Sequence, residues 1–325
     1  MDGTFIRGKV IEPGKLRQMM QRSDLRGAMQ AGSHFGTIMV TGALLWATWG
    51  TWWAVPLFMI QGVLINFLYA GQHELSHGTP FKTKWLNEWL GRLIGFLMIF
   101  PRDFDLIMHT AHHKWTQDWE RDGELVREPY TLKTYLLWVL GPTYWWTRFT
   151  RLYRLCRGIV IEPYIRPDQE HVVVREARMH VAIYAAIALV SIVAQSWAAV
   201  ILWLAPMLVM KFVHQLQNTI EHLGLSHEAN IFENTRSTRT NALLRWMCWN
   251  MQYHTAHHAF PSVPFHRLQE LNAEMTAGMG QPPHSMGYLA FQLEVIRKLS
   301  RGKSEEDYPY DEVWISAKGD RAVLD

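Results

Sequence analysis

Nine of the sixteen histidines in this chain fall into four short clusters with the spacing of metal ligands. One cluster reads His-x-x-x-His, two read His-x-x-His-His, and the fourth is a single histidine in Asn-x-x-x-His. Residues three or four positions apart share one face of a helix, so four helices can direct all nine imidazoles toward one point. The nine candidate metal ligands are His73, His77, His109, His112, His113, His222, His254, His257 and His258.

This number of imidazoles indicates two metal ions. A structural zinc ion takes four ligands, and a catalytic zinc ion usually takes three from the protein. Two ions sharing nine histidines, with Asn218 bound directly or through water, would each have four to five nitrogen ligands and an open position. Imidazole binds iron, copper, zinc and nickel, so the ligand type alone does not identify the metal.

Acidic side chains near the clusters are candidates for orienting the histidines. A ligating histidine usually donates its second ring N–H to a carboxylate or a carbonyl group. Asp118, Glu74 and Glu221 lie close enough in sequence to accept these hydrogen bonds, although each could also be an ordinary solvated acid. His214 precedes Asn218 by four residues and could line the site, whereas the other histidines outside the clusters are interpreted as packing or surface residues. We assign no catalytic side chain beyond the metal centre.

Two long stretches without Asp, Glu, Lys or Arg must position these clusters. A helix needs roughly 20 apolar residues to cross a bilayer. The first stretch predicts a hairpin of two spans over residues 34–70, with its turn near Gly50. The second predicts a tighter hairpin over residues 178–211, with its turn near Gln195. Many of the tryptophans lie near the predicted span ends, which is typical of residues at a membrane interface.

The charge distribution predicts how these spans are oriented. The two turns carry no charge, whereas the segment between the hairpins is rich in Lys and Arg. Basic segments stay on the cytoplasmic side, so both termini and the active site are expected there. Residues 85–101 and 131–149 are predicted to be helices lying in the interface. The predicted fold class is therefore an all-α integral-membrane protein, with four transmembrane helices in two hairpins and a helical cytoplasmic cap that carries the histidines.

The chain divides into three predicted parts. Residues 1–33 form a cytoplasmic N-terminal segment without an evident signal peptide, residues 34–270 form the membrane domain, and residues 271–325 form a cytoplasmic C-terminal tail. The charged residues 302–325 are expected to be loosely ordered. The net charge of +3 is explained by basic loops beside an anionic membrane and does not indicate a nucleic-acid partner. The two cysteines lack the spacing of a disulfide or a metal site.

The ordered set of clusters resembles the membrane fatty-acid desaturase and hydroxylase superfamily. The resemblance covers residues 34–270 and is close at residues 249–264, which read Trp-Asn-Met-Gln-Tyr-His-Thr-Ala-His-His-Ala-Phe-Pro-Ser-Val-Pro. It implies a di-iron centre with two iron ions, O2 as co-substrate and a lipophilic substrate bound beneath a cytoplasmic cap. It also implies a location in the bacterial inner membrane or an equivalent lipid bilayer. Because the chain has no His-Pro-Gly-Gly motif of a fused cytochrome b5, we expect a separate electron donor of the ferredoxin, rubredoxin or cytochrome b5 type, with its reductase.

For such a centre, the expected reaction is the O2-dependent oxidation of an unactivated C–H bond in a fatty-acyl-like substrate. No side chain abstracts that hydrogen, so the metal and O2 must do so while the protein supplies position and electronics. Desaturation is the expected outcome. Hydroxylation and oxidative decarboxylation to a terminal alkene are alternatives, because the outcome depends on how the substrate is placed.

Two functions of other classes compete with this interpretation. His73-Glu-Leu-Ser-His77 is similar to the HExxH motif of zinc hydrolases, with Glu74 in the position of the general base. A membrane zinc hydrolase would leave three histidine clusters unexplained. A metal transporter would place its ligands inside the spans at bilayer depth, whereas these clusters lie at span ends and in the cytoplasmic segments.

Overall fold

The computed structural model describes residues 10–125 and 127–324, and it is mostly helical. The described part begins with helices α2 (Pro13–Met19), α3 (Asp24–Ala47) and α4 (Ala54–Ser76). The turn between α3 and α4 contains Gly50 with a φ of +89°, so the predicted position of this turn is confirmed. Helix α3 begins before the expected start at residue 34 because Ser23 caps it, its Oγ accepting the Arg26 N–H at 3.3 Å.

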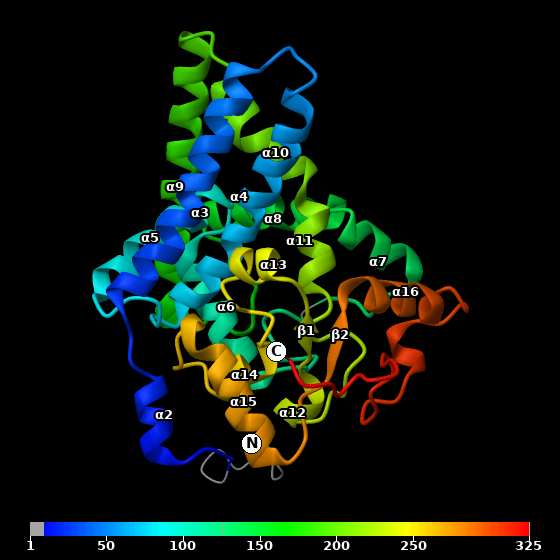
Figure 1. The fold of residues 1–325 in the computed structure, drawn as a ribbon. Helices are drawn as coiled ribbons and strands as arrows, with labels where there is room; N and C mark the ends of the chain where they lie inside the picture. The colour runs from blue at the N-terminus through cyan, green and yellow to red at the C-terminus, as the bar shows by residue number, and fades with distance from the viewer. Residues whose placement is uncertain (1–9, 126, 325) are drawn as a thin grey trace.

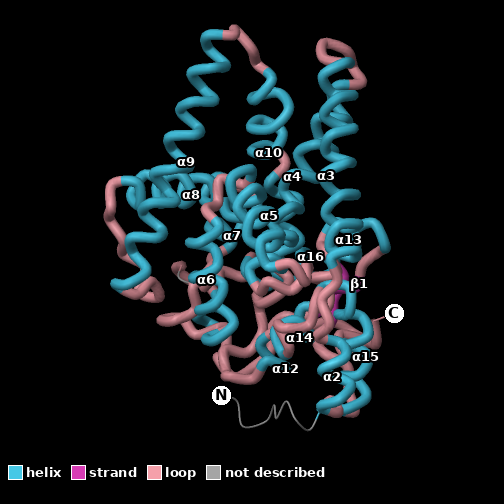
Figure 2. The backbone as a smooth tube through the Cα atoms, turned by 90° about the vertical axis from the view of Figure 1, so that its left-hand side faces the viewer, coloured by secondary structure: helices cyan, strands magenta, loops and turns pink. Residues whose placement is uncertain are grey.

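The second hairpin is less regular than the first. Its elements are α9 (Pro167–Val193), the π-helix η1 (Val200–Leu204), α10 (Ala205–Val209) and α11 (Lys211–Asn218). Gln195 lies in the turn after α9, where it was predicted, and has a φ of +50°. The returning arm bends by 40° between α10 and α11. Both hairpins project from the same side of the molecule (Figure 1, Figure 2).

Two of these helices, α4 and α9, are long and apolar enough to cross a membrane, and the bent arm from η1 to α11 would form a third span. The protein therefore has two to three candidate spans within the described residues, and the four expected spans are not all found. Helix α3 has 24 residues but is not among the candidates, and Gln30, Ser33 and His34 reduce its apolar character. Helix α9 exposes Leu189 and Ile192 along its outer surface, as expected of a helix that faces lipid.

Four helices connect the two hairpins, and they are α5 (Lys84–Leu97), α6 (Arg102–Trp115), α7 (Leu132–Val139) and α8 (Pro142–Cys156). Helix α5 and the pair of α7 and α8 occupy the two segments predicted as interfacial helices. Ion pairs between side chains hold helix α6 against its neighbours. Arg92 of α5 lies 3.0 Å from Asp103 of α6 and 3.2 Å from Glu176 of α9. The Asp103 N–H also donates to Glu176 at 2.7 Å, which holds the start of α6 against α9.

The remaining elements form the cap below the hairpins (Figure 1). They are α12 (Ile231–Asn234), β1 (Ser237–Arg239), α13 (Ala242–Met247), α14 (His254–Ala259), η2 (Phe265–Arg267), α15 (Leu268–Met279), β2 (Ser285–Gly287), α16 (Tyr288–Leu299) and η3 (Glu305–Asp307). Strands β1 and β2 pair in parallel, with Thr238 opposite Met286. The prediction of a purely helical fold is therefore wrong for these two short segments, which satisfy their backbone groups by pairing with each other.

The C-terminal residues pack onto the cap up to residue 324. Trp314 and Ile315 are buried, and Tyr308 stacks on Trp314 with ring centroids 4.2 Å apart. The buried Arg236 donates to the Ile315 carbonyl oxygen. The expectation that residues 302–325 are loosely ordered is wrong for the described part, because a few aromatic and aliphatic side chains anchor an otherwise charged segment.

Candidate metal centre

The nine predicted histidines meet between the hairpins and the cap. Helix α6 carries three of them and α14 carries three. Helix α4 and its C-terminal cap residue carry two, and the turn after α11 carries His222. Helix α6 can place its histidines here because Asp103 and Asp105 occupy its first turn, where acids favour the N-terminus of a helix, and the ion pairs of Asp103 hold that turn in position.

Five histidines form one group, called here the five-histidine group. It consists of His73, His77, His109, His113 and His257, which offer ring nitrogen atoms within 4.8 Å of one another. The Nε2 atoms face one another: 2.8 Å separates His77 from His109, and 2.8 Å separates His73 from His257. His257 Nε2 also lies 3.1 Å from His113 Nε2.

The other four predicted histidines form a second group, called here the four-histidine group. It consists of His112, His222, His254 and His258, again with ring nitrogen atoms within 4.8 Å of one another. His222 Nε2 lies 2.8 Å from His254 Nε2 and 3.1 Å from His112 Nε2. The Nε2 atom of His258 is buried and has no hydrogen-bond partner among the described residues.

The hydrogen bonds of these rings fit a cation at the point where they meet. His109 Nδ1 donates to Glu124 at 3.1 Å, and His222 Nδ1 donates to the Asn234 carbonyl oxygen at 3.1 Å. A neutral imidazole has one N–H, so the Nε2 atoms of both rings carry lone pairs toward their neighbours. If two nitrogen atoms each lie about 2.1 Å from one metal ion and the N–metal–N angle is a right angle, the nitrogen atoms are about 3 Å apart, as the Nε2 atoms are here. The donor set therefore suits one metal ion in each group.

Burial keeps most of these imidazoles in the neutral form that binds metals. It lowers the pKa of His257 to about 3 and that of His222 to about 4, and the charge of His112 acts in the same direction. His112 is the exception. Burial opposes its protonation, but the carboxylates of Asp122, Glu124 and Glu221 raise its pKa to about 9.

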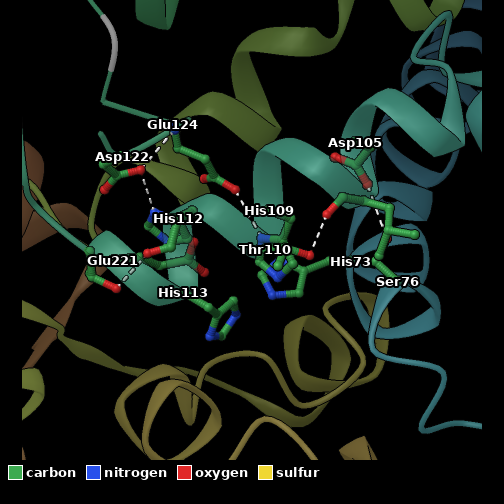
Figure 3. Close-up of polar contacts among 12 residues, drawn as sticks. His73, Ser76, Asp105, His109, Thr110, His112, His113, Asp122, Glu124 and Glu221 are labelled. Carbon is green, nitrogen blue, oxygen red and sulfur yellow. Dashed lines mark hydrogen bonds and ion pairs between the residues drawn. The ribbon is translucent and has the colours of Figure 1, made fainter. Parts of the chain in front are cut away.

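Two of the carboxylates that support the histidines lie in the loop after α6 (Figure 3). Asp122 accepts the Nδ1–H of His112 at 2.8 Å, and Glu124 accepts that of His109. Asp122 is itself held by the N–H groups of Gln117 and Glu124, both at 2.8 Å. These partners fix each ring so that its Nε2 faces the centre.

The sequence prediction named a different acid of the same loop. Asp118 binds the exposed Arg121 side chain and makes no contact with the nine histidines, so its expected role is taken by Asp122 and Glu124. The loop returns to the histidines because Gly123 packs closely on α6. A Cβ added at Gly123 would lie 2.7 Å from the Met108 carbonyl oxygen. The Asp-Gly pair was the available signal, since it favours a turn.

The structure brings the other two predicted acids to the histidines. Glu74 is buried, lies 3.3 Å from His257 Nδ1 and accepts the N–H of Phe265 at 3.1 Å. Glu221 lies 3.8 Å from His254 Nδ1. Burial raises the pKa of Glu221 to about 8, and the nearby Glu124 adds to this increase.

Asn218 and His214 lie beside the two groups. The Asn218 side-chain amide donates to Glu221 at 3.0 Å, so Asn218 touches an acid that supports the four-histidine group. His214 belongs to neither group, because its Nδ1 contacts Lys211 Nζ at 3.1 Å and its ring packs on Tyr69. Both residues line a cavity next to the centre.

A comparison with protein families gives one match. The model described as fatty acid desaturase matches residues 33–290, which include all nine histidines and their supporting acids. No curated protein matches the chain.

Proposed function

This chain belongs to the fatty acid desaturase family, and we propose that it is an integral-membrane di-iron enzyme that uses O2 to oxidise an unactivated C–H bond in an acyl-like substrate. The observation that carries the proposal is the convergence of nine imidazoles, from helices far apart in sequence, into two groups. Imidazole ligands suit iron as well as zinc, and the family resemblance favours iron. Desaturation is the reaction we propose first.

The two groups would hold one ion each. When bound, these ions would supply the O2-dependent removal of hydrogen from carbon, which no side chain can perform. The chain itself supplies neutral imidazoles and fixes their direction through Asp122, Glu124 and the Asn234 carbonyl group. Hydroxylation and oxidative decarboxylation use the same ligand set, so substrate placement, and not the ligands, distinguishes the three outcomes.

The electron donor and the orientation belong to the proposal. A separate ferredoxin, rubredoxin or cytochrome b5 with its reductase would deliver electrons at the cytoplasmic face. The charge-free turns would then face outward, and both termini and the cap would face the cytoplasm. Cysteines placed at Thr51 and Ser196 should react only with an external reagent, and cysteines at Ser23, Thr134 and Ser304 only from inside. Labelling of position 134 from outside would contradict this orientation.

The geometry disfavours the two functions of other classes. In a zinc hydrolase, Glu74 would act as general base on a water molecule. Here the Glu74 carboxylate is fully buried, accepts hydrogen bonds from Thr79 and Phe265, and lies beside a histidine ring. A transporter would need ligands along its spans, whereas these histidines cluster at helix ends and in the cap.

Product analysis tests the reaction directly. The reduced enzyme is incubated with a deuterated acyl chain and 18O2, and the products are examined by mass spectrometry. An alkene without label and with the carbon count of the substrate is the expected result. A labelled alcohol would mean hydroxylation, and an alkene shorter by one carbon would mean decarboxylation. O2 consumption only with a water-soluble, non-aliphatic compound would contradict the proposed substrate class.

A further inference from the structure

A cavity of about 340 Å³ lies between helices α4 and α11 of the two hairpins and the connecting segment from α6 to α8. The lining side chains on α4, α8 and α11 include Tyr69, Tyr144, Arg148, Arg151, Lys211 and Gln215. A smaller cavity, with His112 and His222 in its wall, shares Glu124 and Asn218 with the larger one. The larger cavity therefore adjoins the four-histidine group.

The wall of this cavity carries hydrogen-bond donors that lack acceptors. Lys211 is 1% exposed, and its Nζ contacts His214 at 3.1 Å and lies 4.0 Å from the centre of the Tyr144 ring. It forms no ion pair with a carboxylate within the described residues. Three further buried groups lack a hydrogen-bond partner within the described part of the chain, and they are Arg148 Nη1, the Tyr144 hydroxyl and the Gln215 amide nitrogen. Buried donors without partners cost free energy, and buried ionisable groups in membrane proteins commonly mark a ligand pathway.

Among the described residues, no acidic side chain near the cavity forms an ion pair with Lys211 or Arg148. Glu124 accepts the hydrogen bond of a histidine, Glu128 is exposed, and Glu162 lies 3.6 Å from Arg151. Asp105 is buried nearby on α6 but forms no ion pair within the described part of the chain. Lys211 and Arg148 thus face an internal space in which no described carboxylate forms an ion pair with either of them, which suits an anionic ligand.

Helix α8 separates this cavity from an apolar groove. Tyr144, Arg148 and Arg151 follow one another at intervals of four and three residues, share one face of α8 and line the cavity. Phe149 and Leu152, also on α8, line an apolar groove of about 660 Å³ formed with α9 and η1. Helix α8 therefore presents a charged side to the cavity and an apolar side to the groove.

We propose that this cavity binds the carboxylate of a free aliphatic acid through Lys211 and Arg148. The inference rests on the proposed function and deepens it, because it makes the substrate an unesterified acid and not an acyl thioester or a phospholipid acyl chain. A carboxylate accepts charge-assisted hydrogen bonds from both side chains. The carbonyl group of an ester or thioester is neutral and would offer neither side chain a charged acceptor.

Competition binding tests this assignment without turnover. Purified, metal-loaded protein in detergent is incubated with radiolabelled dodecanoic acid, and the competitors are the unlabelled acid, its methyl ester, dodecanol and dodecyl phosphate. The acid should displace the label at least about tenfold better than the ester or the alcohol, since hydrogen bonds between charged groups contribute this much. Equal displacement by the methyl ester, or no saturable binding of the acid, would overturn the proposal. Stronger displacement by dodecyl phosphate would also overturn it, in favour of a phosphate head group.

Two variants sharpen the test. Lys211→Met and Arg148→Gln should each lower the affinity for the acid about tenfold and leave the affinity for the methyl ester unchanged, a pattern that misfolding cannot produce. Arg157→Gln, at the exposed C-cap residue of the same helix, is the matched control and should bind like the unmodified protein. An unchanged preference for the acid in Lys211→Met and Arg148→Gln would contradict the proposal. O2 consumption is measured separately, so a chain that binds acids but oxidises no aliphatic compound would refute the proposed function alone.

Discussion

The two histidine groups differ in what holds their imidazoles in place. In the five-histidine group the rings come from α4 with its C-cap, α6 and α14, and within the described residues carboxylates contact the Nδ1 atoms of His109 and His257 alone. In the four-histidine group every ring has an oxygen neighbour. These neighbours are Asp122 for His112, the Asn234 carbonyl group for His222, Glu221 for His254 and Thr116 for His258. All five rings of the first group come from helices or a helix C-cap, whereas one ring of the second group, His222, comes from a turn.

The groups also differ in their access to the cavities. Only the four-histidine group contributes residues to the walls of the described cavities, through His112 and His222. It offers one imidazole fewer, and Asn218 lies beside it. We therefore expect the substrate and O2 to approach the four-histidine group, while the five-histidine group acts as the more rigid half of the centre.

Removal of one imidazole should give the largest effect and should separate the two groups. His222→Ala leaves three imidazoles in its group and should lose about one metal ion per chain, because three ligands hold a metal less firmly than four. His113→Ala leaves four and should retain more metal, although both variants should be inactive. Elemental analysis of the purified variants checks this, with the exposed His171→Ala as control. Two ions retained in His222→Ala would refute the grouping.

The next effect concerns the loop after α6. Asp122→Asn removes the negative charge behind His112 and leaves one oxygen to accept from His112 or from the Gln117 N–H, so it should weaken metal binding by about 10-fold to 100-fold. Asp118→Asn is the matched control, because Asp118 binds Arg121 away from the histidines. Chelator competition measures both affinities. Equal affinities in the two variants would mean that Asp122 does not support the four-histidine group.

A smaller effect is expected for the corresponding acid of the five-histidine group. Glu124→Gln replaces the partner of His109 but leaves the other four imidazoles untouched, and glutamine can still accept the Nδ1–H. Metal affinity should fall by less than about tenfold. The same chelator competition measures it. A loss larger than that of Asp122→Asn would reverse the proposed order of rigidity between the two groups.

The smallest effect concerns Asn218. Asn218→Ala removes one of two amide donors to Glu221, while Gln217 keeps the other at 2.9 Å. The metal content should stay unchanged, and kcat/KM should fall by about tenfold or less, as for the loss of one hydrogen bond to a charged group. Gln217→Ala is the matched variant, since Gln217 does not line the cavity. If Gln217→Ala lowers kcat/KM as much as Asn218→Ala does, Asn218 acts only through Glu221.

The sequence predicted which histidines meet, because helical spacing is local information. His109, His112 and His113 had to share a face of α6, and the same holds for the histidines of α14. The supporting acids were harder to predict. Asp122 reaches His112 over a loop whose path depends on Gly123 packing against α6, and such a contact has no helical period. Asp118, the acid named from sequence, lies nearer to His112 in the chain but not in space.

Contacts between distant segments also limited the prediction of the hairpins. Charge-free stretches predicted both turns, but not the bend between α10 and α11 or the buried position of Lys211. A lysine at the end of an apolar stretch was interpreted as the end of a span. In the structure, the helix direction changes there and the side chain faces an internal cavity, where only tertiary packing determines its surroundings.

The most direct test of the central claim is the metal content of an active preparation. Protein purified from iron-replete cells should contain close to two iron ions per chain and should consume O2 when it receives electrons and an aliphatic substrate. The two groups of imidazoles predict this number, one ion for each group. An active preparation with one zinc ion and no iron would contradict the account.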